Sequence, residues 1–98
     1  MKDARRCRCA ISDRDNIFTY IEIENPRAAV HVDQKIVFAV RRLVEFPESG
    51  KPGRIAGTRE LVIPSTPYIA AYVVHEDRIR ILRVLHGAQI WPDDISTE

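Results

Sequence analysis

The sequence predicts an α+β fold, in which an antiparallel helix hairpin packs on a small, mainly antiparallel sheet in the order β-α-α-β-β-β. Two observations support this fold class. Apolar residues recur at helical spacing over residues 13–45, and three short apolar segments separated by turn residues follow over residues 59–85. Because 98 residues with 45% apolar and 30% charged side chains are typical of one globular domain, we expect a single domain over residues 1–98.

The N-terminal segment, residues 1–10, is predicted as an irregular first strand because its alternation through Cys7 and Cys9 is weak. Two cysteines at i and i+2 close poorly into a disulfide, and the three histidines are scattered rather than paired. We therefore expect reduced thiols, no metal and no cofactor.

The first helix is predicted over residues 13–24, because Ser12 and Asp15 match a capping box and apolar residues follow at helical spacing. Asn25-Pro26 then ends this helix and starts the next, with asparagine as the N-cap and proline in the first turn. The second helix should reach about residue 45. Its apolar stripe consists of Ala29, Val32, Ile36, Val40 and Leu43.

Residues 46–57 contain two prolines and three glycines and are predicted as a loop. Three strands follow, at residues 59–63, 68–75 and 78–85, and the last two form a hairpin through a tight turn. In the last strand Ile79 and Ile81 should face one side of the sheet, with Val84 on the other.

The distribution of charge and hydropathy bounds the function classes. No apolar run is long enough to span a membrane and no signal segment opens the chain, so we expect a cytoplasmic protein. Net charge is only +1, yet the segment from residue 50 to residue 91 contains six basic residues and only three acidic ones. Residues 93–98 form an acidic tail. This basic half fits either a nucleic acid or acidic protein partner, or a solvated strand face.

Three residues are weak candidates for catalysis. His86 could act as an acid or base near neutral pH, and Arg59 and Arg83 could hold phosphate, as RNA cleavage requires. The structural alternative is that His86 caps backbone groups at a strand end and that Arg59 pairs with an acid or braces the preceding loop.

Aromatic residues offer a second kind of site. Tyr68, Tyr72 and Trp91 could stack nucleic-acid bases, but they are more typical of core or groove residues, with Trp91 folding the tail back on the sheet. The candidates for binding a protein partner or target are Arg54, Arg59, Tyr68, Tyr72, Arg83, His86, Gln89 and Trp91.

Several strings together resemble the ParE branch of the RelE/ParE toxins over residues 12–92. They are "NPRAA", "PESGKPGR", "GTREL", "TPYIAAYVV" and "ILRVLHGAQIWP". The resemblance implies the toxin of a bacterial type II toxin–antitoxin module, bound by a cognate antitoxin as a hetero-oligomer. ParE-type members are similar to inhibitors of DNA gyrase that act by binding, whereas RelE-type members resemble ribosome-dependent mRNA endonucleases.

Two departures bear on this resemblance. Ile69 stands where RelE-type nucleases have an arginine, and a basic end of the last strand is replaced by His86, Gly87 and Gln89. Residues 1–10 also lack the apolar, aromatic start that members have. The favoured interpretation is a ParE-like toxin without enzymatic activity; the alternatives are an mRNA endonuclease using His86, or an inactive, decayed toxin.

Overall fold

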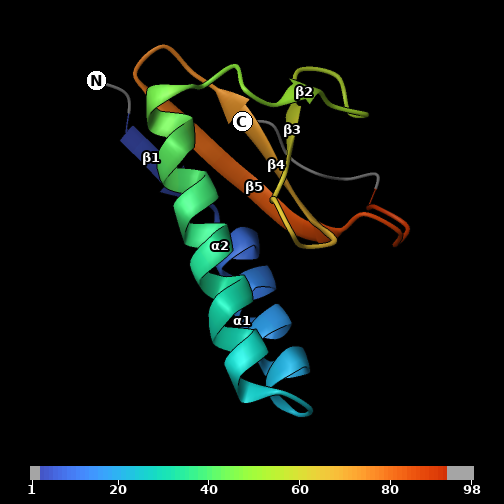
Figure 1. Cartoon of the computed structure of the whole chain (residues 1–98). Helices are drawn as coiled ribbons and strands as arrows, with labels where there is room; N and C mark the ends of the chain where they lie inside the picture. The colour runs from blue at the N-terminus through green and yellow to red at the C-terminus, as the bar shows by residue number, and fades with distance from the viewer. Residues whose placement is uncertain (1–2, 93–98) are drawn as a thin grey trace.

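The computed structural model describes residues 3–92, so the predicted acidic tail lies outside the described residues. Seven elements follow one another along the chain (Figure 1). They are β1 (Asp3–Arg6), α1 (Arg8–Glu22), α2 (Pro26–Glu45), β2 (Lys51–Pro52), β3 (Arg59–Val62), β4 (Tyr68–Val74) and β5 (Arg78–His86). The strands form one sheet in the order β1-β5-β4-β3-β2.

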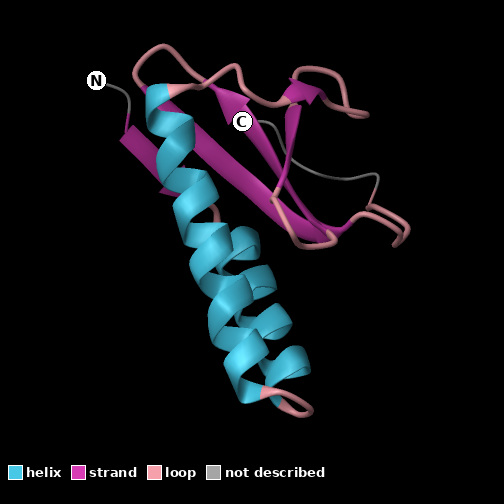
Figure 2. Ribbon diagram, viewed as in Figure 1, coloured by secondary structure: helices cyan, strands magenta, loops and turns pink. Residues whose placement is uncertain are grey.

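The two helices form an antiparallel hairpin on one face of the sheet, and the closed end of the hairpin extends beyond it (Figure 2). The predicted junction between them is confirmed. The Asn25 side chain accepts a hydrogen bond of 3.1 Å from the Ala28 backbone N–H, and Pro26 occupies the first helical position. This arrangement satisfies one of the unpaired donors at the helix start and fixes the reversal of the chain.

The predicted start of α1 is wrong. The helix begins at Arg8, and its N-cap residue, Cys7, makes no side-chain capping bond. The Cys7 backbone N–H instead donates to the Ile81 carbonyl at 2.9 Å, so the chain turns directly from the sheet into the helix. Ser12 consequently lies inside the helix rather than at its cap.

The sheet is mainly antiparallel, as predicted. β5 pairs with β4, β4 with β3 and β3 with β2 in antiparallel fashion, whereas β1 runs parallel to β5. The predicted first strand therefore exists, but only over residues 3–6. β2 was not predicted: it lies inside the expected loop and covers only the first two residues of β3.

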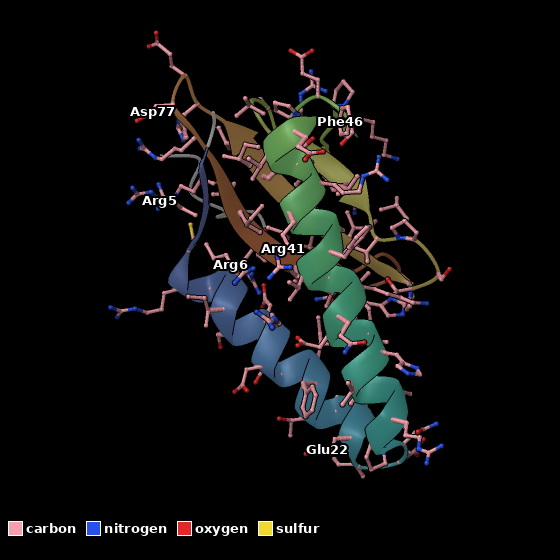
Figure 3. The ribbon with its side chains drawn as sticks, turned by 60° about the vertical axis from the view of Figure 1, so that its left-hand side comes forward. Arg5, Arg6, Glu22, Arg41, Phe46 and Asp77 are labelled. Atoms are coloured by element: carbon pink, nitrogen blue, oxygen red, sulfur yellow. The ribbon has the colours of Figure 1, made fainter. Side chains whose placement is uncertain are left out.

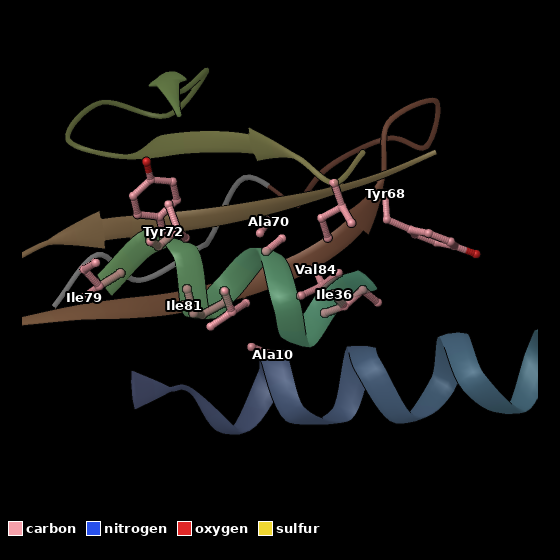
Figure 4. Close-up of a cluster of buried hydrophobic side chains, with 12 residues drawn as sticks. Ala10, Ile36, Tyr68, Ala70, Tyr72, Ile79, Ile81 and Val84 are labelled. Atoms are coloured by element: carbon pink, nitrogen blue, oxygen red, sulfur yellow. The ribbon is translucent and has the colours of Figure 1, made fainter. Parts of the chain in front are cut away.

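The core lies between the helices and the sheet (Figure 4). A bulge in β5 decides which side chains reach it: Tyr72 is opposite Ile81 and Ala71 opposite Arg83, which leaves Leu82 as the extra residue. The bulge brings Val84 into the same cluster as Ile79 and Ile81. The prediction that Val84 faces the other side was wrong for this reason.

None of the described helices combines the length and apolar character needed to cross a membrane. Cys7 and Cys9 are both free thiols, as predicted.

Candidate functional site

Arg83 is held by an acid from the other end of the chain. Its Nε and Nη2 atoms donate to the Asp13 carboxylate of α1 at 2.6 and 2.9 Å, and the Val84 backbone N–H donates to the same group at 3.0 Å. β1 pairs with β5 only as far as Ile81. Beyond that point the Asp13 carboxylate, in place of a strand, accepts the hydrogen bond from the Val84 backbone. Arg83 is thus engaged in a structural ion pair.

Arg59 braces the loop before β3. Its Nη1 donates to the Gly50 carbonyl at 2.7 Å. This contact agrees with the structural alternative, in which Arg59 braces the preceding loop. Tyr72 supports the same loop from the core: its hydroxyl accepts from the Gly50 N–H and donates to the Pro47 carbonyl, each at 2.9 Å. Burial raises the pKa of Tyr72, and its ring is fully enclosed, so it does not offer a stacking surface.

Arg54, Glu60 and Trp91 form a cluster at the β3 end of the sheet. Arg54 donates from its backbone N–H at 2.7 Å and from its guanidinium at 3.1 and 3.2 Å to the buried Glu60 carboxylate. Although burial opposes the charged form, these bonds and the charges of Arg54 and Lys51 hold the pKa of Glu60 below its usual value. The Arg54 guanidinium also lies 3.7 Å from the centroid of the Trp91 ring.

Trp91 is buried against Ala71 and Leu85, with Ile69 packed beside them. The predicted packing of Trp91 on the sheet is therefore confirmed.

His86 organises the turn that follows β5. Its Nδ1 accepts from the Ala88 N–H at 3.0 Å, and its backbone N–H donates to the Gln89 Oε1 at 2.8 Å. The Trp91 Nε1–H donates to the His86 carbonyl at 3.3 Å. The imidazole meets Tyr68 edge-on, with the ring centroids 5.6 Å apart. All these contacts agree with a backbone-capping histidine.

The three catalytic candidates do not converge. In the sheet, Arg59 pairs with Tyr72 and His86 pairs with Tyr68. Tyr68 and Tyr72 are four residues apart on β4, a backbone separation of about 13 Å. Arg83 is committed to Asp13 on the helix side. In this arrangement Arg59 bonds a loop carbonyl, Arg83 bonds Asp13 and His86 bonds its own turn.

A different feature, absent from the sequence predictions, has the form of a binding site. A groove of about 800 Å³ runs between α2 and the end of β3. α2 packs against β1 and β5 and leaves β3 uncovered, so the groove stays open. Phe38 of α2 and Phe46, the residue that caps the end of α2, line it with 64% and 52% of their surfaces exposed, opposite Leu61 and Pro64.

The rim of this groove is basic. One face of α2 lines it with three residues at positions i, i+4 and i+11, namely His31, Lys35 and Arg42. The other polar lining residues are Gln34 of α2 and the loop residues Ser49 and Ser65. No acidic residue lines the groove among the described residues. Arg42 also lies over the Phe46 ring, 5.5 Å from its centroid. One signal was present in the sequence: Phe38 falls off the apolar stripe of α2, where a large aromatic has no core to enter.

Two helices on one face of a small mixed sheet form the fold of the small α+β toxins of type II toxin–antitoxin modules. The family described as "ParE toxin of type II toxin-antitoxin system, parDE" matches residues 8–91. The chain therefore belongs to the ParE toxin family, and it is a type II toxin of the ParE/RelE group.

Individual relatives agree. The chain is 47% identical over 83 residues to the candidate toxin Y4kP of Sinorhizobium fredii, covering 85% of each chain. It is 33% identical to Toxin RelE2 of Caulobacter vibrioides, covering 83% of this chain and 90% of that one.

Two solved structures share the fold. One, from the chromosomal ParDE system of P. aeruginosa, has a TM-score of 0.80 at 29% identity and covers 88% of this chain and 96% of that one. The other, from the toxin–antitoxin complex RelBE2 of Mycobacterium tuberculosis, has a TM-score of 0.60 at 26% identity, with 87% and 96% covered. Both belong to toxin–antitoxin systems, which supports an antitoxin as the partner of this chain.

Proposed function

We propose that this toxin arrests growth by binding its target rather than by cleaving RNA, and that the target is DNA gyrase. The observation that supports binding is the separation of the catalytic candidates: Arg83 is paired with Asp13, Arg59 with loop carbonyls, and His86 with its own turn. Membership of the ParE family supports gyrase as the target.

A supercoiling and DNA-cleavage assay with purified chain and gyrase tests the target. We expect loss of supercoiling or accumulation of cleaved DNA, and reversal on adding the antitoxin. Unaltered gyrase activity at saturating toxin would refute the assignment. New ends on translated mRNA, lost in His86→Ala, would favour the ribosome-dependent endonuclease instead. Growth arrest on induction of the chain alone, relieved by the neighbouring antitoxin gene, excludes a decayed toxin.

The antitoxin, in this proposal, lays an amphipathic acidic helix into the groove between α2 and β3. Phe38 and Phe46 provide apolar surface that is exposed in the free chain, and such surface on a soluble protein marks an interaction site. Lys35 and Arg42 on the rim would meet acidic side chains flanking the apolar face of the helix.

The double variant Phe38→Ala/Phe46→Ala tests the groove by titration calorimetry with the cognate antitoxin. Losing two exposed aromatic contacts at the centre of an interface costs about 2 kcal/mol or more, so we expect at least about a 30-fold weaker Kd. Tyr20→Ala is the matched control, because Tyr20 is 75% exposed but lies near the closed end of the hairpin. Equal weakening by Tyr20→Ala would contradict the placement.

A further inference from the structure

Arg6 lies near the charges of two other arginines, Arg14 and Arg41, and each of the three comes from a different element. Arg6 ends β1, Arg14 lies in the second turn of α1 and Arg41 lies in the last third of α2, which also provides Asp33. Figure 3 shows the Arg6 and Arg41 side chains close together where β1 meets the two helices. Arg6, Arg14 and Arg41 are called the arginine cluster below.

Asp33 is the acid that binds Arg14. Arg14 binds Asp33 through two guanidinium nitrogens, with an Nη2–Oδ2 distance of 2.8 Å, and this hydrogen bonding lowers the pKa of Asp33. Arg14 is therefore paired with Asp33, whereas Arg6 and Arg41 have no ion-pair partner among the described residues.

The pKa of Arg6 is lowered by burial and by its positively charged neighbours. Partial burial is the largest cause that lowers the pKa of Arg6, and the charges of Arg14 and Arg41 lower it further, against a smaller opposing effect of Asp33. Like charges held together in this way favour a bound anion that would relieve the repulsion. The cluster consists only of guanidinium groups, whose planar donors match phosphate oxygens in pairs.

The surroundings favour a nucleic-acid backbone over an acidic protein. Arg8, two residues after Arg6 at the start of α1, is also exposed and adds a further basic side chain to this part of the chain. The exposed aromatic side chains that protein interfaces use as central contacts, Tyr20, Phe38 and Phe46, belong to the hairpin end or the groove. The large apolar side chains that line a pocket with Arg14 are Ile11, which is exposed, and Phe18, which is partly buried.

We propose that the arginine cluster of Arg6, Arg14 and Arg41 binds phosphate groups of a nucleic-acid backbone, without reading its sequence. Arg41 and the groove residue Arg42 are consecutive on α2 and point roughly 100° apart, so the two surfaces are distinct. Nucleic acid and a protein in the groove could then be held at the same time, and this proposal does not depend on the target of the toxin.

Fluorescence anisotropy with a labelled DNA duplex of about 20 base pairs and arbitrary sequence tests the proposal, over about 50 to 200 mM salt. We expect wild-type chain to bind with an affinity that falls with salt. Arg6→Gln/Arg41→Gln should weaken binding about tenfold at low salt and reduce the slope of log K against log salt by about 0.9 to 1.8, for one or two lost phosphates. Single-stranded RNA in parallel distinguishes the source of the phosphate.

The matched control is Arg27→Gln/Lys51→Gln, which removes the same charge from exposed positions away from the cluster. It should leave the slope unchanged. Equal loss in this control, or no binding by wild type at low salt, would overturn the proposal. So would displacement of the duplex by polyglutamate at equal charge, since carboxylates would then satisfy the cluster. Arg41→Gln alone, at an exposed helix position, should reproduce the weakening in part if the double variant fails to fold.

Discussion

Deleting the hydroxyl of Tyr72 should loosen the loop that joins α2 to β3. The hydroxyl lies in the core and is bonded to the Gly50 N–H and the Pro47 carbonyl, each at 2.9 Å. The loop approaches this hydroxyl so closely at Gly50 that a Cβ at that position would lie 2.5 Å from the hydroxyl oxygen. Tyr72→Phe keeps the ring and removes both bonds at once.

The magnitude follows from the two bonds. Each is worth about 1 kcal/mol net, so the free energy of unfolding should fall by about 2 kcal/mol. A 98-residue domain has an unfolding entropy of about 0.2 kcal/mol/K near its midpoint, and Tm should therefore fall by about 10 °C.

Thermal unfolding followed by circular dichroism measures this change. Tyr68→Phe is the matched control: Tyr68 is also buried, but its hydroxyl makes no hydrogen bond within residues 3–92, so Tm should move by less than about 2 °C. A drop below about 2 °C for Tyr72→Phe, or equal drops for both variants, would refute the view that the hydroxyl fixes the loop.

Three further predictions concern the ion pairs and Trp91. Asp13→Ala should cost about 1–3 kcal/mol in urea unfolding, because the Val84 N–H loses its acceptor; an unchanged midpoint would contradict this. The lowered pKa of Glu60 means that its charge stabilises the fold above its unfolded pKa near 4.5 and that this contribution is lost as pH falls through the lower folded value. Glu60→Gln should therefore be less stable than wild type at neutral pH, with the difference shrinking in acid; a difference independent of pH would argue against it. Arg54→Ala should shift the emission of Trp91, the single tryptophan, to longer wavelength as water reaches the ring; unchanged emission would show that the cation does not cover it.

The predictions that succeeded depend on local signals. Asn25-Pro26 fixed the junction of the helices because both residues act on their own backbone, through a side-chain cap and a restricted φ angle. The strands over residues 59–85 were placed within one or two residues because alternation and turn residues are local too. The apolar stripe of α2 likewise identified four buried positions, Ala29, Ile36, Val40 and Leu43.

The predictions that failed depend on contacts distant in sequence. The capping box at Ser12 was plausible locally, but pairing of Cys7 with Ile81 starts the helix earlier. The bulge at Leu82 reverses the side of the sheet that Val84 faces, and only the register against β4 defines it. The groove escaped prediction because an exposed Phe38 becomes a site only when β3 lies opposite.

The sequence by itself determined the helix hairpin, the three consecutive strands and the family. The tertiary structure decided what the charged residues do. Arg83 could hold a phosphate or an internal acid, and Asp13, 70 positions away in the chain, selects the acid. Arg6 and Arg41 show the opposite outcome, since the fold places them near each other and neither makes an ion pair within residues 3–92. Electrostatic partners are chosen by distance in space, and spacing along a chain does not encode that distance.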